Sequence, residues 1–242
     1  MLRHTRLLFL LLPWLIAGCS LFKKAIIDAP PDGHYLVVQM GKQKAEQKHM
    51  YVKSEQETIK MYGLNQKQTT WEIDTTSVSR ISLPEELPDN SHQTWMLKQN
   101  HLDIDLLSHP IKLRPAQSSL PAQLNAEVNA AIYIGYRSDR YLLTYKPTLF
   151  NNYKRHLHHW AYSIGMFSGL GNAFISPTTT HFLLPQEYDG IVWSNGITLL
   201  FAVDNFTCGI SFATDHLLDL NRSIWVYQGK LWAGLALGLN LN

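Results

Sequence analysis

Residues 124–136 of the chain read LNAEVNAAIYIGY, and their side chains alternate in character along the stretch. The positions that share a parity with Leu124 and Tyr136 are apolar or aromatic, whereas those between them, from Asn125 to Gly135, are mostly polar or small. A period of two is typical of a β-strand with one apolar face. Because ordinary globular strands hold about 5–6 residues, a strand of this length fits better in a bilayer-spanning barrel, whose tilted strands need about 9–11 residues.

The same alternation recurs along the C-terminal half of the chain. The segments that carry it are residues 102–106, 111–114, 124–136, 141–146, 160–166, 191–203, 206–213 and 231–241. Lipid cannot satisfy an open strand edge, so a sheet in a bilayer must close, with an apolar outer face and a small or mutually bonded polar interior. We therefore predict that residues 99–242 form an antiparallel, membrane-type β-barrel of about eight strands.

Turns and aromatic residues complete this prediction. Residues 108–110 (SHP) and 137–139 (RSD) are expected to be turns that separate neighbouring strands. Seven aromatic residues near the expected strand ends are candidates for girdles at the membrane interfaces: Tyr136, Tyr141, Tyr145, Trp160, Trp193, Trp225 and Trp232.

Alternation of this kind also fits a soluble β-sandwich or a lipocalin-like barrel, whose apolar face lines its own core. In a lipocalin-like barrel, a cavity for a small apolar ligand would be lined by Trp160, Phe201, Phe206 and Phe212. The glycine-rich small face favours a filled lumen, and the strand length favours a membrane. Against the membrane barrel, residues 239–242 (LNLN) lack the terminal aromatic residue that outer-membrane barrels usually carry.

Residues 34–98 have a different composition: they are polar, rich in lysine and glutamine, and broken into short β-type runs. Residues 58–62 and 71–74 alternate in the way that is typical of half-buried strands. We predict a small, polar, antiparallel β-module that faces water, which makes the whole chain all-β. An exposed strand edge in this module would allow an envelope protein partner to bind by strand addition.

The N-terminal region has the layout of an export signal. Residues 1–18 contain Arg3 and Arg6 followed by an apolar run that is too short to span a bilayer. Residues 15–19 (LIAGC) resemble a bacterial lipobox, whose cysteine is acylated once the preceding peptide is removed. We predict a lipoprotein signal peptide at residues 1–18, lipidation of Cys19 and a lipid-anchored tether at residues 19–33. The alternatives are an ordinary signal peptide with a chance cysteine and an uncleaved signal anchor.

Charge and cysteine content narrow the possible partners. The chain has 21 Lys and Arg residues against 19 Asp and Glu residues, and cleavage would remove Arg3 and Arg6 and balance the two. A mature chain without net charge or a basic block gives no reason to expect a nucleic-acid partner. Lipidation of Cys19 would leave Cys208 alone, so no disulfide is expected and stability must come from packing and strand pairing.

Six charged residues are expected to face the lumen and form a polar network there: Asp103, Asp105, Arg114, Glu127, Arg137 and Arg140. The two aspartates share one face of a strand, and paired carboxylates can act as acid and base. We favour ion pairs with the arginines instead, because a confined charge needs a partner.

Other candidate chemistry is weaker. His156 and His158 share a strand face and could present two imidazoles to a metal, but no carboxylate or cysteine lies at ligand spacing, so a solvated loop leading into a strand is the better interpretation. Asp215 and His216 with Ser211 nearby suggest a hydrolase triad, yet the nucleophile-elbow motif is missing. We therefore predict no catalysis, no metal site and no cofactor.

Six short stretches carry a resemblance to a family: residues 102–105 (LDID), 131–137 (AIYIGYR), 187–190 (EYDG), 204–207 (DNFT), 227–230 (YQGK) and 238–242 (GLNLN). In this combination, about residues 95–242 resemble a group of uncharacterised exported proteins of Bacteroidota. The resemblance implies an envelope location in a Gram-negative cell and no particular activity. Surface-exposed lipoproteins of that phylum tend to carry acidic residues after the lipidated cysteine, whereas this chain has residues 20–24 (SLFKK), which implies an anchor that faces the periplasm.

Together these observations predict a lipoprotein of the cell outer membrane that contacts lipid through acylated Cys19 and through the barrel exterior. It would be a structural or interaction component of the cell envelope, without a large aqueous pore, because eight strands enclose only enough room for side chains. The alternative is a periplasm-facing lipoprotein whose soluble, lipocalin-like barrel binds a small apolar ligand.

Overall fold

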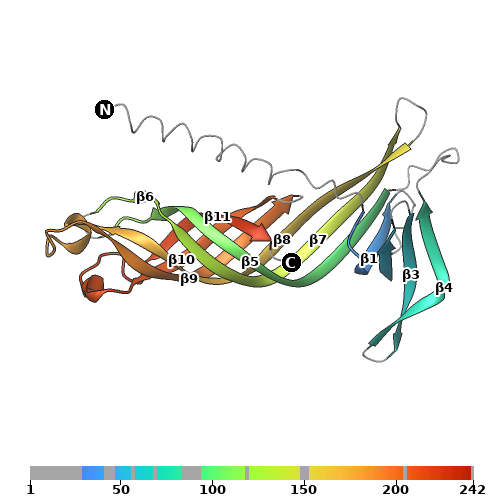
Figure 1. The fold of residues 1–242 in the computed structure, drawn as a ribbon, viewed down its shortest axis with the longest axis horizontal. Helices are drawn as coiled ribbons and strands as arrows, with labels where there is room; N and C mark the ends of the chain where they lie inside the picture. Colours follow the sequence, from blue (N-terminus) through green and yellow to red (C-terminus); the bar gives the residue numbers. More distant parts are fainter. Residues whose placement is uncertain are drawn as a thin grey trace, which may run out of the picture.

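The computed structural model describes residues 29–40, 47–55, 58–67, 70–82, 94–117, 120–147, 153–203 and 206–240. The predicted signal peptide, Cys19 and the first part of the predicted tether lie outside the described residues. The described chain is almost entirely β, which confirms the predicted fold class, and it forms one long antiparallel sheet of 11 strands (Figure 1).

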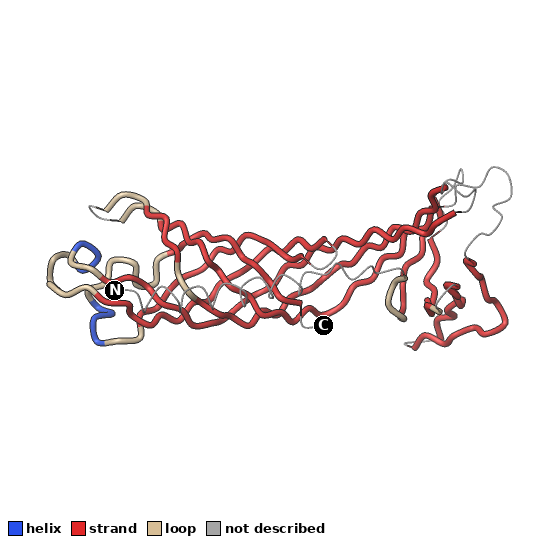
Figure 2. Tube along the Cα trace, turned by 45° about the horizontal axis from the view of Figure 1, so that its top comes forward, coloured by secondary structure: helices blue, strands red, loops and turns tan. Residues whose placement is uncertain are grey.

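The strands follow one another along the chain with few interruptions. Their bounds are β1 (Gly33–Met40), β2 (Gln47–Ser54), β3 (Thr58–Lys67), β4 (Thr70–Ser82), β5 (Thr94–Arg114), β6 (Gln123–Ala126), β7 (Asn129–Pro147), β8 (Tyr153–Ile175), β9 (Tyr188–Val203), β10 (Phe206–Leu217) and β11 (Leu231–Asn240). Two short 3-10 helices, η2 (Thr178–Thr180) and η3 (Leu220–Ser223), lie with the loops at one end of the molecule (Figure 2). No helix in the described part of the chain is long and apolar enough to cross a membrane.

Six strands close on themselves. Strands β5, β7, β8, β9, β10 and β11 are neighbours in that order, and β11 pairs back with β5 from Ala233↔Leu113 to Asn240↔Asp105. We call these six strands the strand ring; Figure 1 shows them crossing obliquely around the long axis of the molecule. The ring corresponds to the predicted antiparallel barrel, although it has six strands where about eight are expected from the sequence.

The strand number is lower because both expected turns lie inside long strands. Residues 108–110 belong to β5, which has 21 residues, and residues 137–139 belong to β7, which has 19. At the first position, the pairing of β5 with β11 shifts register between Ser108 and Ile111, so Pro110 is accommodated in a bulge rather than a turn. The side chain of Asn129 accepts a hydrogen bond from the backbone N–H of His109 and donates to its carbonyl oxygen (2.6 Å), which satisfies the bulged backbone.

The alternating stretch of residues 124–136 forms β6 and the first part of β7. Both strands pair with the same edge of β5, and they are separated only by Glu127 and Val128. The predicted single strand is therefore interrupted at one point, where the Glu127 side chain is buried.

Strands β1–β4 extend the same sheet beyond the ring. Strand β1 pairs with the N-terminal end of β5, from Leu36↔Lys98 to Met40↔Thr94, and β2, β3 and β4 follow as a meander (Figures 1 and 2). The hydrophobic core at this end combines residues of the predicted polar module with residues of the long strands: Tyr35, Val37, Val52, Ile59, Met61, Leu97, Tyr141 and Leu143. We call this end of the molecule the module end.

Candidate functional site: the outer face and interior of the strand ring

The outer face of the strand ring is apolar on all six strands. We call the following exposed side chains the apolar belt: Leu102, Ile104, Leu106, Ile111, Leu113, Ile132, Ile134, Tyr136, Ile164, Met166, Leu170, Phe174, Ile191, Trp193, Ile197, Leu199, Phe201, Val203, Phe206, Ile210, Phe212, Leu231, Leu235 and Leu237. Their exposed fractions run from 38% at Leu237 to 70% at Met166. Soluble monomers rarely expose a continuous apolar surface of this extent.

The strand register shows that the apolar belt is continuous. Leu102 pairs with Tyr136, Tyr136 with Ile164, and Ile164 with Leu199, and the row continues through β10 and β11. It returns to β5 at Ile111 rather than at Leu102, because the strands of a closed ring are staggered. An apolar residue occupies every step of this circuit, so no polar gap interrupts the belt along it.

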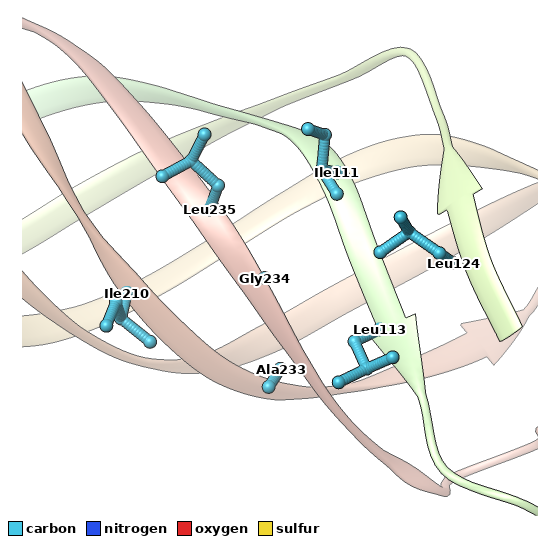
Figure 3. Close-up of a pocket in the computed structure, with 7 residues that line it drawn as sticks. All are labelled: Ile111, Leu113, Leu124, Ile210, Ala233, Gly234 and Leu235. Atoms are coloured by element: carbon cyan, nitrogen blue, oxygen red, sulfur yellow. The ribbon is translucent and has the colours of Figure 1, made fainter. Parts of the chain in front are cut away.

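A shallow groove crosses the apolar belt where β11 meets β5 and β10 (Figure 3). Its volume is about 240 Å³, and the backbone at Ala233 and Gly234 lies between the larger side chains of its walls. The walls are formed by Ile111, Leu113, Leu124, Ile210 and Leu235. Because these side chains are all aliphatic, the groove fits a hydrocarbon chain better than a polar group.

The interior of the ring is charged, which is the reverse of a soluble barrel. Near the end with the loops, Lys112 and Arg114 contact Glu127 and Asp215, and all four side chains are buried. The Lys112 Nζ lies 2.9 Å from Glu127 and 3.1 Å from Asp215, and the Arg114 Nη2 lies 2.7 Å from Glu127 and 2.6 Å from Asp215. Two cations and two anions therefore balance; we call these four residues the Asp215 network.

Neutral groups complete the hydrogen bonds of Asp215. The Ser194 hydroxyl donates to Asp215 Oδ1 (2.5 Å), and the indole N–H of Trp232 donates to the same oxygen (2.8 Å). The Lys112 ammonium also lies 4.5 Å from the centre of the Trp232 ring, at cation–π distance. Trp232, one of the expected girdle residues, is thus buried inside the ring and does not face an interface.

A second group of charges lies inside the ring toward the module end. Asp139 accepts hydrogen bonds from Arg137 Nε (3.2 Å) and His159 Nε2 (2.6 Å), and His101 Nδ1 lies 3.4 Å from its other oxygen. Arg137 also lies 3.6 Å from Asp103. We call these five residues, Asp103, His101, Arg137, Asp139 and His159, the Asp139 network.

Side chains fill the space between the two networks. The Tyr133 and Ser163 hydroxyls are 2.7 Å apart, and Ser211 bonds to both His109 (2.9 Å) and Thr198 (2.7 Å). Buried apolar residues pack around these groups: Leu107, Ala131, Phe167, Leu200, Ala213 and Ala236. The described interior is therefore occupied by bonded polar groups and apolar side chains, as in a small filled barrel.

The six residues predicted for the lumen do not form a single network. Arg114 and Glu127 belong to the Asp215 network, and Asp103 and Arg137 belong to the Asp139 network. Asp105 is also buried. Arg140 lies apart from them, because it projects from the outer face of β7 and donates a hydrogen bond to the exposed Tyr162.

Sequence reasoning missed five members of the networks, namely His101, Lys112, Asp139, His159 and Asp215. The sequence does indicate that Lys112 faces the lumen. It lies between the outward-facing residues Ile111 and Leu113, and it is two residues from Arg114, so the two share one face of the strand. Asp139 was assigned to an expected turn, which removed it from the strand pattern.

The weaker candidates of the sequence do not form sites. His156 and His158 lie within β8 on its outer face, in a strand rather than the expected loop, and His159 points inward to Asp139. Ser211 bonds to His109 and Thr198, and Asp215 bonds to cations, so a hydrolase triad with His216 is not assembled. Among the described residues, no group of three or more His, Cys, Asp or Glu side chains is placed to hold a metal ion.

Comparison of the chain with protein-family models, with curated proteins and with solved structures finds no match. The resemblance to exported proteins of Bacteroidota therefore stays a prediction.

Proposed function

We propose that the strand ring lies in the bilayer of the cell outer membrane and that the chain is a lipoprotein, anchored also by acylated Cys19, that serves as a structural or interaction component of the envelope without catalysis. The observation that carries this proposal is the inverted polarity of the ring. Charged residues such as Lys112 and Asp215 are buried inside it, and the apolar belt surrounds it. Water favours the opposite arrangement, whereas a bilayer favours this one.

Contact of the apolar belt with hydrocarbon would be strongly favourable. Moving one large apolar side chain from water into hydrocarbon is favourable by roughly 1.5–3 kcal/mol when it is fully buried. The apolar belt spans all six strands, so its half-exposed side chains together would supply tens of kcal/mol. Closure of β11 onto β5 removes the free strand edge that lipid could not satisfy.

The module end supports an orientation with this end in water. There the polarity is the ordinary one, with Tyr35, Met61 and Leu143 buried and with Lys53 and His49 exposed. The long strands β5, β7 and β8 run through both ends, so the change of polarity occurs along single strands. With an anchor at Cys19 in the inner leaflet, the module would face the periplasm and be available to an envelope partner.

The lipocalin-like alternative is less well supported. It requires Phe201, Phe206 and Phe212 to line an internal cavity, but these side chains are exposed on the outer face by 50%, 58% and 43%. The interior positions of the same strands carry Ala202, Thr207 and Ser211 instead. An apolar ligand in the lumen would meet small and polar side chains.

The test separates the two possible anchors. Residues 1–19 are replaced by a cleavable signal peptide that provides no lipidated cysteine, and the exported chain is followed by membrane fractionation, alkaline extraction and gel mobility with and without heating. We expect the chain to stay in the membrane fraction and to migrate differently after heating, because closed membrane barrels resist detergent until heated. Release of the chain into the soluble fraction, without a mobility change, would leave Cys19 as the only anchor and overturn the proposal.

A further inference from the structure

We propose that Lys98 and Arg140, beside the aromatic rings of Trp160 and Tyr162, form a binding site for the phosphate group of an anionic membrane lipid. This inference rests on the proposed location of the strand ring in a bilayer and names a lipid contact at its border. All four side chains lie on the outer face of strands β5, β7 and β8.

The four residues lie where the outer face changes from apolar to polar. Lys98 on β5 pairs with Arg140 on β7, and Arg140 pairs with Trp160 on β8. The outer-facing residues of β8 change in order along the strand from the belt to the module end: Met166, Ile164, Tyr162, Trp160, His158, His156 and Lys154. Aromatic residues at such a border are typical of the headgroup level of a bilayer, where one side of the ring is apolar and the other wet.

Arg140 is held in place but keeps a free donor. Its Nη2 donates a hydrogen bond to the Tyr162 hydroxyl (2.9 Å), and its guanidinium carbon lies 5.1 Å from the centre of the Tyr162 ring. The Nε of Arg140 is buried, and within the described part of the chain its solvent-accessible Nη1 donates to no acceptor. A guanidinium that is oriented by a neighbour and still has an unused N–H is suited to bind a phosphate oxygen.

The local charge favours an anion. In the described structure, neither Lys98 nor Arg140 has a carboxylate within 4.0 Å, in contrast to Lys112, Arg114 and Arg137 inside the ring. The described outer-facing positions of β5, β7 and β8 hold neither Asp nor Glu. Two adjacent cations without a counterion would therefore attract a phosphate.

Continuity with the apolar belt indicates a lipid rather than a free anion. Leu102, Tyr136 and Ile164 form the next belt row, four residues along β5, β7 and β8 from the row of Lys98, Arg140 and Trp160. That separation is about 13 Å along a strand. A phospholipid with its phosphate at Arg140 can therefore lay its acyl chains over these side chains, whereas inorganic phosphate gains nothing from them.

The experiment uses the full chain, purified in zwitterionic detergent micelles, and titrates it with short-chain phosphatidylglycerol, short-chain phosphatidylcholine or inorganic phosphate. Binding is measured by intrinsic tryptophan fluorescence and by native mass spectrometry. The variants are the double substitution Lys98→Gln with Arg140→Gln and, as the matched control, Lys154→Gln, which removes a cation from the same outer face farther from the belt. Gel mobility with and without heating is recorded for every sample.

We expect phosphatidylglycerol to bind the unchanged chain and Lys154→Gln alike, and to bind the double variant about tenfold more weakly or worse. Phosphatidylcholine and inorganic phosphate should bind more weakly than phosphatidylglycerol. Equal binding by the double variant, with the heat-dependent shift retained, would overturn the headgroup site and leave the bilayer location standing. Equal binding of inorganic phosphate would indicate an anion site without lipid recognition, and loss of the shift in the unchanged chain would overturn both proposals.

Discussion

Arg114 and Asp215, which are 101 residues apart in the sequence, form an ion pair inside the strand ring, with 2.6 Å between Arg114 Nη2 and Asp215 Oδ2. Neither residue is appreciably exposed, and Lys112 and Glu127 complete the group. The pair joins β5 to β10, two strands that are separated in the ring by β11. This ion pair holds β5 and β10 in position relative to each other, and its two side chains occupy part of the lumen.

Loss of one member of the Asp215 network should destabilise the chain more than loss of a balanced pair. Asp215→Asn leaves two cations facing Glu127 alone and should lower the free energy of unfolding by roughly 3–5 kcal/mol. The double variant Lys112→Met with Asp215→Asn restores the balance and should recover part of that loss. Urea unfolding in detergent micelles measures both. A double variant that is less stable than the single variant would contradict the idea that charge balance holds this network together.

A charge in the apolar belt should be tolerated only if the belt is in water. Leu170→Lys, on β8 and eight residues into the belt from the border residue Tyr162, is expected to reduce the stability of the inserted state by roughly 2–4 kcal/mol, because a lysine near the bilayer midplane is costly. The matched control is His158→Lys, which lies on the same outer face of the same strand and is also exposed, but beyond the aromatic border. Folding into lipid vesicles, followed by the heat-dependent mobility shift, measures the difference. Equal behaviour of the two variants would speak against a bilayer around the ring.

The direction of most side chains in the ring could be predicted from alternation alone. Ile132 and Ile134 point outward and Tyr133 points inward, as the period of two requires. In a regular strand, every second side chain points to the same face, so one known direction gives all the others. Closure of the ring was predicted from the same pattern together with the membrane hypothesis, since a sheet in lipid cannot leave a strand edge unpaired.

The sequence did not reveal where the alternation of inward and outward side chains continues through an apparent turn, or where a bulge interrupts it. Residues 137–139 look like a polar turn, but Arg137 and Asp139 face the lumen and bond to each other, so β7 runs through them. The assumed turn hid the fact that Arg140 shares a parity with Tyr136, which is why Arg140 was expected inside and lies outside. Pro110 was likewise expected in a turn. It lies instead in a bulge of β5 whose backbone is bonded by Asn129, a residue of another strand.

Close packing between β7 and β8 gives a prediction about a glycine. Gly165 pairs with Gly135, and a Cβ at Gly165 would meet the Ile134 carbonyl oxygen and the Gly135 Cα, which are backbone atoms that cannot rotate away. Gly165→Ala should therefore push the two strands apart and cost roughly 1–3 kcal/mol of stability. Ser163→Ala, two residues earlier on the same face, loses only its hydrogen bond to Tyr133 and should cost about 0.5–1.5 kcal/mol. Urea unfolding should rank Gly165→Ala as the more damaging change, and the reverse order would refute the packing argument.

The module end should lose stability in mild acid through His34. Burial and the nearby charge of His49, whose Nδ1 lies 3.0 Å from His34 Nε2, lower the pKa of His34 below its ordinary value of 6.5. The unfolded chain therefore takes up a proton near that pH, and the folded chain does so only at lower pH. Stability is complete above pH 6.5 and falls as the pH decreases toward the lowered pKa. Hydrogen exchange of the β1 and β2 amides should accelerate relative to β9 on acidification, and His34→Gln should remove most of this difference. An unchanged pH dependence in His34→Gln would assign the effect to another group.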